Sequence, residues 1–485
     1  MKRIAFLILL LSAVALAVPY YVGSRAEQDL RTRLESANQE IKASSPSGDI
    51  RLVDYRRGWL ASQGRIEFKL PSDLHDAAGQ PVTLASSIRV SHGPVPALLS
   101  GNFQTALAIV RVDTRISEWL AATGVTLPDS INQSLAAYPP VGVELRVAFD
   151  KSADWLMKAD AYEYQDPSGD WSLRWSALAG QGKVGPNRVD ANGSLTLEQV
   201  DLTAKALAAN LGLKGLSADV DFKRHVSGLY FGRTNFLLKE LQAKMDVGEF
   251  KMVGLGASAD TSGEDGAFGL RINYRLDGLD LTEAGGPSHR AGGEVGFSLK
   301  GLDLVALKQL SDAAGALQAS GTGEPDFAAL MPSVQQLFSE SLKHGPSISI
   351  SPMNLRFDNS KITGELNLSL PKTEPSQLAL GALGLLTQVR GQAKLTIPEE
   401  LARTAMEHYL GQQMALSGDE EEAGDNPGDT QASMALIATT ARDMINQAVG
   451  DGWARRQDKN LHSEMKLEKG NLTVNGKPFP GTGKR

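Results

Sequence analysis

The sequence contains no cysteine. This absence excludes disulfide frameworks, thiolate zinc sites, iron–sulfur clusters and cysteine nucleophiles. A basic surplus is absent as well, because 49 Lys and Arg stand against 56 Asp and Glu, a net charge of −7. Proteins that bind nucleic acids usually present a basic stripe to the phosphates. We therefore expect no nucleic-acid partner.

Recognisable catalytic motifs are also missing. The chain has no Gly-x-Ser-x-Gly elbow and no phosphate-binding loop, and its single Ser-x-x-Lys, at 463–466, lacks the companion motifs of a serine hydrolase. The 7 histidines are scattered without a pair at metal-ligand spacing. A carboxylate pair assembled by the fold stays open. We predict no cofactor and no metal, and we leave enzyme activity undecided, with the balance against it.

An acidic segment at 418–429 is the one stretch that suggests a cation site. Calcium loops place carboxylates at alternate positions and close with a downstream Glu. Asp425, Pro427 and Asp429 do not follow that pattern. We interpret the segment as a solvated, charged turn.

The longest apolar run lies at 4–23 and contains no charged residue. About 20 apolar residues suffice to span the hydrocarbon core of a bilayer. A small-x-small triplet at 15–17 also fits a cleavable signal peptide. Pro19 lies close behind that cleavage position, so we favour an uncleaved membrane anchor. With Lys2 and Arg3 before the span, the N-terminus is expected in the cytoplasm and residues 26–485 outside.

The exported part is expected to be rich in antiparallel strands. The chain has 49 Gly and 22 Pro, which is typical of a turn-rich sequence. Polar and apolar residues alternate in several runs, separated by segments with the composition of hairpin turns. Runs of this kind are found at 143–149, 272–276, 295–299 and 366–370, and turns at 166–169, 262–266, 358–360 and 469–471. One closed core of this length would exceed the usual ceiling of roughly 250 to 300 residues, so an elongated sheet or two lobes is expected.

Two of these runs resemble each other. Residues 272–281 align with 295–304, and their apolar positions coincide. Repetition of this kind indicates one structural unit used more than once. A common strand-and-turn composition explains the likeness equally well, so both interpretations stay open.

Helices interrupt the expected strands. An amphipathic helix is predicted at 26–43, and further helices at 304–319, 325–343, 398–416 and 431–449. The last two are expected to form an antiparallel pair joined by the acidic loop. The domains follow: 1–25 as anchor or signal sequence, 26–48 as helix and linker, 49–397 as a β-rich region with interspersed helices, 398–456 as a helical hairpin, and 457–485 as a terminal β-hairpin and tail.

Two short motifs are the candidate site positions. Tyr55, Arg57, Gly58 and Ser62 lie between strand-like runs at 50–55 and 64–70, where Gly58 suits a bulge or turn. His92-Gly93-Pro94 recurs as His344-Gly345-Pro346. Paired imidazoles at one site would be a functional explanation of this recurrence. We favour structural roles for both motifs, because a Gly-Pro turn after a strand explains the tripeptide.

Together these motifs, the helix entry at 395–398 and the closing segment at 470–476 resemble the YdgA/YihF family. The resemblance spans nearly the whole chain. It implies an inner-membrane protein of Gram-negative bacteria that faces the periplasm, has no assigned function and is dimeric. The family supplies no catalytic residues. The acidic segment is not part of its pattern.

Two hypotheses of function follow. The first is a non-enzymatic envelope binding or scaffold protein of mostly β, α+β class, whose elongated antiparallel sheet, curved into a trough as in AsmA-like lipid-handling proteins, binds a lipid or another apolar ligand. The partners would then be the inner membrane, through 4–23, an apolar ligand and a second copy of the chain. The second is an envelope hydrolase that uses carboxylates or the two His-Gly-Pro turns. Exposed apolar residues on the sheet would favour the first hypothesis.

Overall fold

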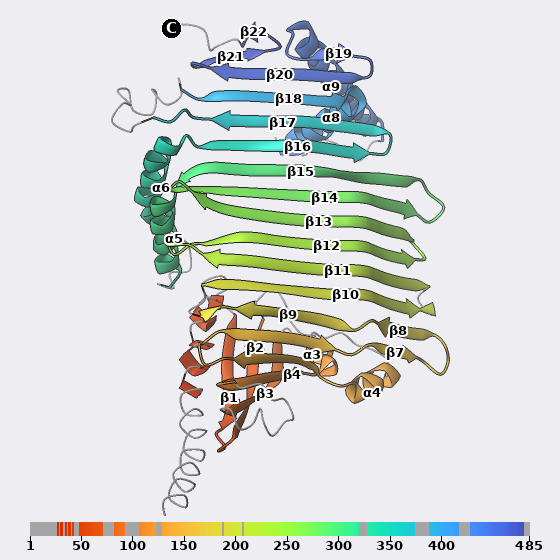
Figure 1. The fold of residues 1–485 in the computed structure, drawn as a ribbon. Coiled ribbons are helices and arrows are strands. Elements are labelled where there is room, and N and C mark those ends of the chain that lie inside the picture. Colours follow the sequence, from red (N-terminus) through yellow and green to blue (C-terminus); the bar gives the residue numbers. More distant parts are fainter. Residues whose placement is uncertain are drawn as a thin grey trace, which may run out of the picture. The chain divides into compact units, whose positions relative to one another are not determined.

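The computed structural model is drawn in Figure 1. It describes residues 27–42 except 29, 33, 36 and 40, and then residues 48–70, 82–92, 106–122, 129–186, 189–205, 208–319, 327–373, 388–416 and 427–479. The chain divides into two compact units. Unit 1 comprises residues 1–249 and 305–335, and unit 2 comprises 250–304 and 336–485.

Unit 1 contains an antiparallel sheet in which most strands pair with the next along the chain. The pairing order is β1–β2–β3–β4–β5–β6–β9–β10–β11–β12, while β8 pairs with both β7 and β10. In Figure 1, β1–β4 run at a steep angle to β10–β12. The strands are β1 (Asp49–Arg56), β2 (Ala61–Lys69), β3 (Thr83–His92), β4 (Ala108–Thr114), β5 (Val141–Val147), β6 (Ala153–Ala159), β7 (Tyr162–Gln165), β8 (Trp171–Trp175), β9 (Leu178–Val184), β10 (Asp190–Ala204), β11 (Ala209–Arg224) and β12 (Tyr230–Met245).

The best-packed part of unit 1 surrounds β3 and a short helix. Ile88 and Val90 of β3 are buried, as are Ile131 and Leu135 of α4 (Asp129–Ala137). The preceding helix, α3 (Ile116–Ala122), contacts β3 and α4. Burying such aliphatic side chains contributes roughly 1.5–3 kcal/mol each, so this region holds much of the stability of the unit.

An indole side chain on β6 determines where glycine is needed on the neighbouring strands. The ring of Trp155 lies over β9 and β10, where a Cβ built on Gly182 or Gly193 would approach it to 2.4 Å and 2.5 Å. Contacts that short do not occur between real side chains. The two glycines therefore make room for the indole.

Unit 2 contains a second antiparallel arrangement of strands. β14–β15–β16–β17–β18–β20–β21–β22 pair in that order, and β19 pairs with β20. Figure 1 shows β14 to β18 side by side in chain order. The strands are β13 (Gly248–Glu264, from residue 250 in this unit), β14 (Ala267–Glu283), β15 (Ser288–Asp303), β16 (Ser347–Phe357), β17 (Ser360–Ser369), β18 (Arg390–Pro398), β19 (Arg455–Gln457), β20 (Asn460–Glu468), β21 (Asn471–Val474) and β22 (Lys477–Pro478).

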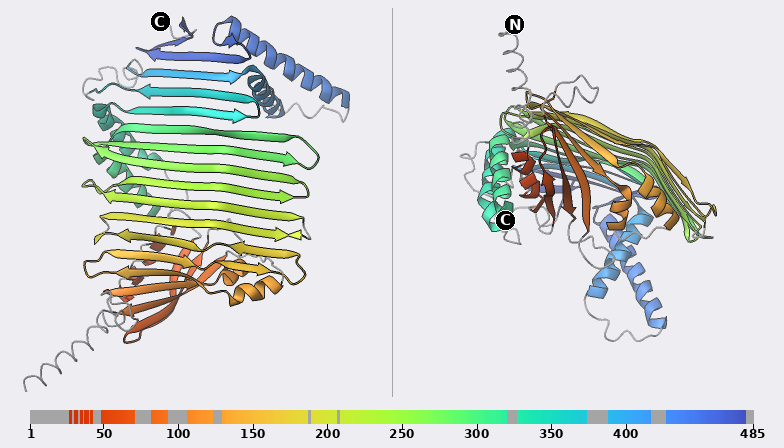
Figure 2. Two further views of the ribbon diagram at one scale, coloured as in Figure 1. Left: turned by 45° about the vertical axis from the view of Figure 1, so that its right-hand side comes forward. Right: turned by 90° about the horizontal axis from the view of Figure 1, so that it is seen from below.

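The helices predicted at 304–319, 325–343, 398–416 and 431–449 occur, whereas α3 and α4 were not predicted. The elements in the predicted ranges are α5 (Leu304–Ala319), α6 (Phe327–Ser341), the short 3₁₀ helix η3 (Leu342–His344), α8 (Glu399–Leu416) and α9 (Pro427–Gly450). Gly345 ends η3 with a φ of 69°, the left-handed conformation that favours glycine at this position. α8 contacts α9, and Figure 2 shows both extending away from the strands of unit 2. The described residues between 27 and 42 are helical.

The predicted class of mostly β with added helices is confirmed. All four predicted strands and all four predicted turns occur, as β5, β14, β15 and β17 and as the connections between strands. The two similar segments form neighbouring antiparallel strands, with Ile272 opposite Phe297. An AsmA-like trough stays a prediction.

The predictions of a membrane anchor and of an acidic loop concern residues that the structure mostly does not describe. None of the described helices combines the length and the apolar composition needed to cross a bilayer. The predicted anchor at 4–23 and most of the acidic loop, 418–426, lie outside the described residues, whereas 427–429 begin α9. A closed helical hairpin with an acidic loop therefore stays a prediction. Among the described residues, no group of three His, Asp or Glu side chains is arranged to hold a metal ion.

Candidate functional site

One face of the strands in unit 2 is apolar from β14 to β20. In an antiparallel pair, directly opposed residues lie on the same face. The register opposes Ile272 to Phe297, and Phe297 in turn to Ile350. The same row continues through Leu366 to Ala393 and Met465. We call this the apolar face; it comprises Leu270, Ile272, Tyr274, Leu276, Val295, Phe297, Leu299, Ile348, Ile350, Met353, Leu355, Phe357, Ile362, Leu366, Leu368, Ala393, Leu395, Ile397, Leu461, Met465 and Leu467.

The alternate residues form a polar face. Arg275 is opposed to Glu294, and Glu365 to Lys394. Ser298 and Ser349 join their hydroxyls at 2.7 Å across β15 and β16. Lys394 lies 2.7 Å from Glu365 in an exposed ion pair. The two sides of the strands therefore differ sharply in chemistry.

The apolar face keeps much of its surface accessible to solvent. Six of its side chains, one on each strand except β15 and two on β16, are 37–56% exposed: Tyr274, Ile348, Phe357, Leu368, Leu395 and Met465. Of the whole face, only Leu461 is buried. Monomeric soluble proteins rarely expose contiguous apolar patches larger than a few hundred Å², and larger patches mark sites of interaction. Solvent-facing apolar residues are the feature that the binding hypothesis requires.

The extent of this face follows from strand spacing. Neighbouring strands lie about 4.8 Å apart, so the six strands from β14 to β20 cover about 24 Å across their direction. The hydrocarbon core of a bilayer is about 30 Å thick, so a single leaflet and its acyl chains measure about 15 Å. An extended acyl chain fits on the face.

The sequence motifs converge at a different place, in unit 1. Ser62 of β2 and His92 of β3 lie on the same face of the sheet, and Ser62 Oγ is 2.8 Å from His92 Nε2. Both side chains are 0% exposed. Tyr55 of β1 packs against Gly64, whose absent side chain leaves room for the phenol ring. Three of the candidate positions therefore form one buried polar cluster.

The cluster is shielded from solvent and only partly hydrogen-bonded. Within the part of the chain that the structure describes, neither the Tyr55 hydroxyl nor His92 Nδ1 has a hydrogen-bond partner. Burial lowers the pKa of His92, and the charge of Arg57 lowers it further. The lowered pKa of His92 keeps the imidazole neutral. Burial also raises the pKa of Tyr55, and the nearby Ser62 opposes that shift without reaching hydrogen-bonding geometry.

The helix before β1 closes one side of this cluster. The Arg31 guanidinium lies 5.8 Å from the centre of the Tyr55 ring, in a cation–π arrangement. Glu27 lies 3.2 Å from Arg31 and 4.0 Å from Arg57. Arg57 thus contributes to packing and charge rather than to an open site.

The remaining motif positions have structural surroundings. Gly58 lies in the turn between β1 and β2, where a Cβ would come within 2.3 Å of the Ala61 carbonyl oxygen. Gly93 and Pro94 lie outside the described residues. His344 belongs to unit 2, where its Nε2 lies 3.1 Å from Asp303. Each imidazole has its own partner within its own unit.

The Ser62–His92 pair is unsuited to nucleophilic catalysis. A serine nucleophile needs a substrate within reach and a third group that orients the histidine. Here the serine is inaccessible, and no described residue forms a hydrogen bond with Nδ1 of the histidine as a third group. The pair links β2 to β3 within the core.

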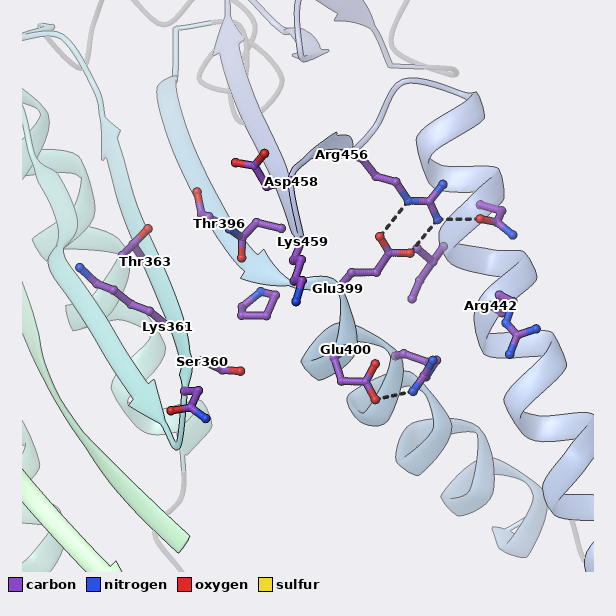
Figure 3. Close-up of a pocket in the computed structure, with 16 residues that line it drawn as sticks. Ser360, Lys361, Thr363, Thr396, Glu399, Glu400, Arg442, Arg456, Asp458 and Lys459 are labelled. Carbon is purple, nitrogen blue, oxygen red and sulfur yellow. Dashed lines mark hydrogen bonds and ion pairs between the residues drawn. The ribbon is translucent and has the colours of Figure 1, made fainter.

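A polar pocket lies at one end of the strands of unit 2 and is drawn in Figure 3. Its volume is about 840 Å³. Arg456 donates two hydrogen bonds to Glu399, of 2.8 Å and 2.7 Å, and a further one of 2.7 Å to Asn446. The hydrogen bonds from Arg456 lower the pKa of Glu399. This fork fixes α8 and α9 against β19 at the wall of the pocket.

The comparison with protein families places the chain. A family model described as DUF945, bacterial protein of unknown function, matches residues 1–481. The chain belongs to the DUF945 family. Membership of a bacterial family of unknown function over nearly the whole chain is thereby confirmed, while the YdgA/YihF assignment and the membrane anchor stay predictions. No curated protein and no solved structure gives a significant match to this DUF945 protein.

Sequence reasoning missed two features of this DUF945 protein. The apolar face was implied by each alternating run, but its continuity depends on register, which a single strand does not encode. The pocket residues come from segments almost 100 positions apart, with Ser360 and Lys459 as examples. Their charges are ordinary surface charges in the sequence, and only the helix entry at 395–398 was noticed as a motif.

Proposed function

We propose that this DUF945 protein is a non-enzymatic envelope protein that binds the acyl chain of a lipid along the apolar face of unit 2. One observation carries the proposal: six large apolar side chains on that face are 37–56% exposed, although the other face of the same strands is polar. Leaving such a surface in water is costly, at roughly 25 cal/mol per Å² of apolar area. A bound apolar ligand removes that cost.

The composition of the face favours an acyl chain over a protein partner. Protein interfaces draw most of their binding energy from Trp, Tyr and Arg. This face is built from Leu, Ile, Val and Met, and its aromatic residues are Tyr274, Phe297 and Phe357. The backbone groups of β15 to β18 are already used in pairing on both sides, so an added peptide strand finds no free edge there. Aliphatic side chains without directional bonds suit a flexible hydrocarbon chain.

The proposal includes the location of the protein in the cell, which we base on the sequence. The uncharged segment 4–23 would hold the chain in the inner membrane, and residues 26–485 would lie in the periplasm. A lipid-binding protein that is anchored in a bilayer would be close to a supply of its ligand. A second copy of the chain is a further partner within the proposal.

The test uses photocrosslinking in living bacteria with the full chain. A photoreactive phenylalanine analogue is placed at Leu368, on the apolar face, or at its neighbour Asn367, on the polar face. Both positions are exposed and lie on the same strand, β17. After irradiation, the protein is purified under denaturing conditions and the adduct masses are measured.

We expect lipid adducts at position 368 and few or none at 367. Equal yields at both positions would show that the face has no preference for lipid. Protein adducts alone at position 368 would replace the proposal with a docking surface for another chain.

A further inference from the structure

We propose that the polar pocket of unit 2 binds an organic phosphate that carries hydroxyl groups, of the kind found in a glycerol phosphate or a sugar phosphate. This goes beyond the proposed function, because the pocket is a separate site from the apolar face. Lys361, Thr363 and Thr396 line it and belong to the polar side of β17 and β18. The acyl-chain proposal and this one can therefore fail independently.

Four separate segments build the pocket. They are the β16–β17 turn with the start of β17, the end of β18 with the first turns of α8, the C-terminal part of α9, and β19 with the β19–β20 turn. Figure 3 shows Lys361 and Arg442 on opposite sides of the opening, with Lys459 between them. The Glu399–Arg456 fork holds two of these segments together. The walls are thus positioned by paired strands and packed helices.

The charges that line the pocket do not balance. Five basic residues, Lys361, Arg403, Arg442, Arg456 and Lys459, face three acidic ones, Glu399, Glu400 and Asp458. Glu399 is paired with Arg456, and Glu400 with Arg403. Among the described residues, Lys361, Arg442 and Lys459 have no carboxylate within 4.0 Å. A surplus of two positive charges matches a phosphate dianion.

A second observation concerns Lys361. The β16–β17 register places it directly opposite Arg356, on the same face. Like charges directly opposite each other destabilise a strand pair. Arg356 donates a hydrogen bond of 3.1 Å to the carbonyl oxygen of Asp277, and among the described residues neither Arg356 nor Lys361 has a carboxylate within 4.0 Å. A bound anion would relieve the repulsion between them.

The remaining lining residues indicate what the phosphate is attached to. An 840 Å³ pocket is far larger than a phosphate ion and lies within the usual range for small-molecule sites of about 300–1,000 Å³. Hydroxyl and amide side chains make up most of the uncharged lining, with Asn359, Ser360, Thr363, Thr396, Asn446 and Asn460. Such groups both donate and accept hydrogen bonds, as sugar and glycerol hydroxyls require.

The test is calorimetric titration of the full chain, in detergent and at low ionic strength, with sn-glycerol 3-phosphate. Inorganic phosphate and glycerol are titrated separately, and dihexanoyl phosphatidylglycerol tests whether a lipid headgroup supplies the same chemistry. Arg442→Gln and Lys459→Gln remove one charge each from the exposed lining. Arg390→Gln is the matched control, because Arg390 is exposed at the far end of β18 and is not part of the pocket.

We expect glycerol 3-phosphate to bind more tightly than inorganic phosphate and far more tightly than glycerol. Each pocket variant should weaken binding about tenfold or more, since a charge-assisted hydrogen bond is lost, while Arg390→Gln leaves it unchanged. Binding of the short-chain lipid alone would assign the phosphate to a headgroup. No binding of any phosphate ester, equal binding of inorganic phosphate, or equal affinity of the pocket variants would overturn the proposal.

Discussion

Ser62 Oγ lies 2.8 Å from His92 Nε2, and both side chains are 0% exposed. The pair links β2 to β3 and joins the two motifs singled out in the sequence. It is surrounded by apolar neighbours such as Val90 and Ala108. Its role is to satisfy one nitrogen of a buried histidine. The first prediction tests that role.

Ser62→Ala should destabilise unit 1 by about 1–3 kcal/mol, because it removes the hydrogen-bond partner of a buried imidazole nitrogen. Hydrogen exchange at the amides of β2 and β3 measures this loss locally. Ser87→Ala is the control: Ser87 lies on the same strand as His92 but is exposed, with only a 3.3 Å bond to a carbonyl. Equal protection in both variants would contradict the assignment.

The pH dependence of the same strands follows from the lowered pKa of His92. The unfolded state takes up the proton near pH 6.5, whereas the buried histidine resists it. Stability from this group is therefore complete above pH 6.5 and is lost as pH falls through the lower pKa of the folded state. Exchange at β2 and β3 should accelerate below pH 6.5, after correction for intrinsic exchange rates. His92→Gln should abolish the pH dependence, although it also lowers stability.

Substitution of the glycines beneath Trp155 should be costly. A Cβ at Gly182 would meet both the indole and the Asn192 carbonyl oxygen, at 2.4 Å and 2.2 Å. We expect Gly182→Ala to destabilise unit 1 by about 1–3 kcal/mol through overpacking. Gly212→Ala on β11 is the comparison, because the nearest atom to its Cβ would lie at 3.7 Å. Denaturant titrations that fail to separate the two variants would argue against this packing.

The Glu399–Arg456 fork predicts an acid-sensitive attachment of α8. The Arg456 hydrogen bonds hold the pKa of Glu399 below its usual value of 4.5. The fork is intact above pH 4.5 and breaks as pH falls through the lower value of the folded state. Glu399→Gln should raise hydrogen exchange in the first turns of α8 at neutral pH. Glu365→Gln, which breaks the exposed pair with Lys394, should leave α8 unchanged.

Local patterns in the sequence predicted several strands and helices. The elements that they missed depend on pairing between strands. Alternation identified β5, β14, β15 and β17, and helix start and stop signals located α5, α6, α8 and α9 to within a few residues. The long strands β10–β12 carry the same alternation but were interrupted by glycines such as Gly193 and Gly215, which hid their length. Propensity is local, whereas strand length is decided by the neighbours.

The candidate sites also depend on contacts between segments that are far apart in the sequence. His92 and Ser62 belong to two separate sequence motifs, and nothing in the sequence joins residues 30 positions apart into one hydrogen bond. Met353 illustrates the limit of sequence patterns for the apolar face. It lies three residues after Ile350, so strict alternation would place the two on opposite sides. One extra residue in β16 returns Met353 to the same side, opposite Gly364.

That extra residue has a consequence for how the gene can change. In each strand between β14 and β20, every second residue belongs to the apolar face. Bulges in β14, β15 and β16 keep the apolar residues on that face where the strict alternation is interrupted. Deleting residue 351 or 352 would remove the bulge and leave Ile350 and Met353 on the same side, whereas deleting residue 349, in the regular part of the strand, would turn one part of β16 over. An insertion or deletion of two residues within a strand keeps the apolar residues on the same face. Insertions or deletions of any length at hairpin turns such as 285–286 also leave the apolar face unchanged. Related genes should therefore vary in length at those turns and in even steps elsewhere.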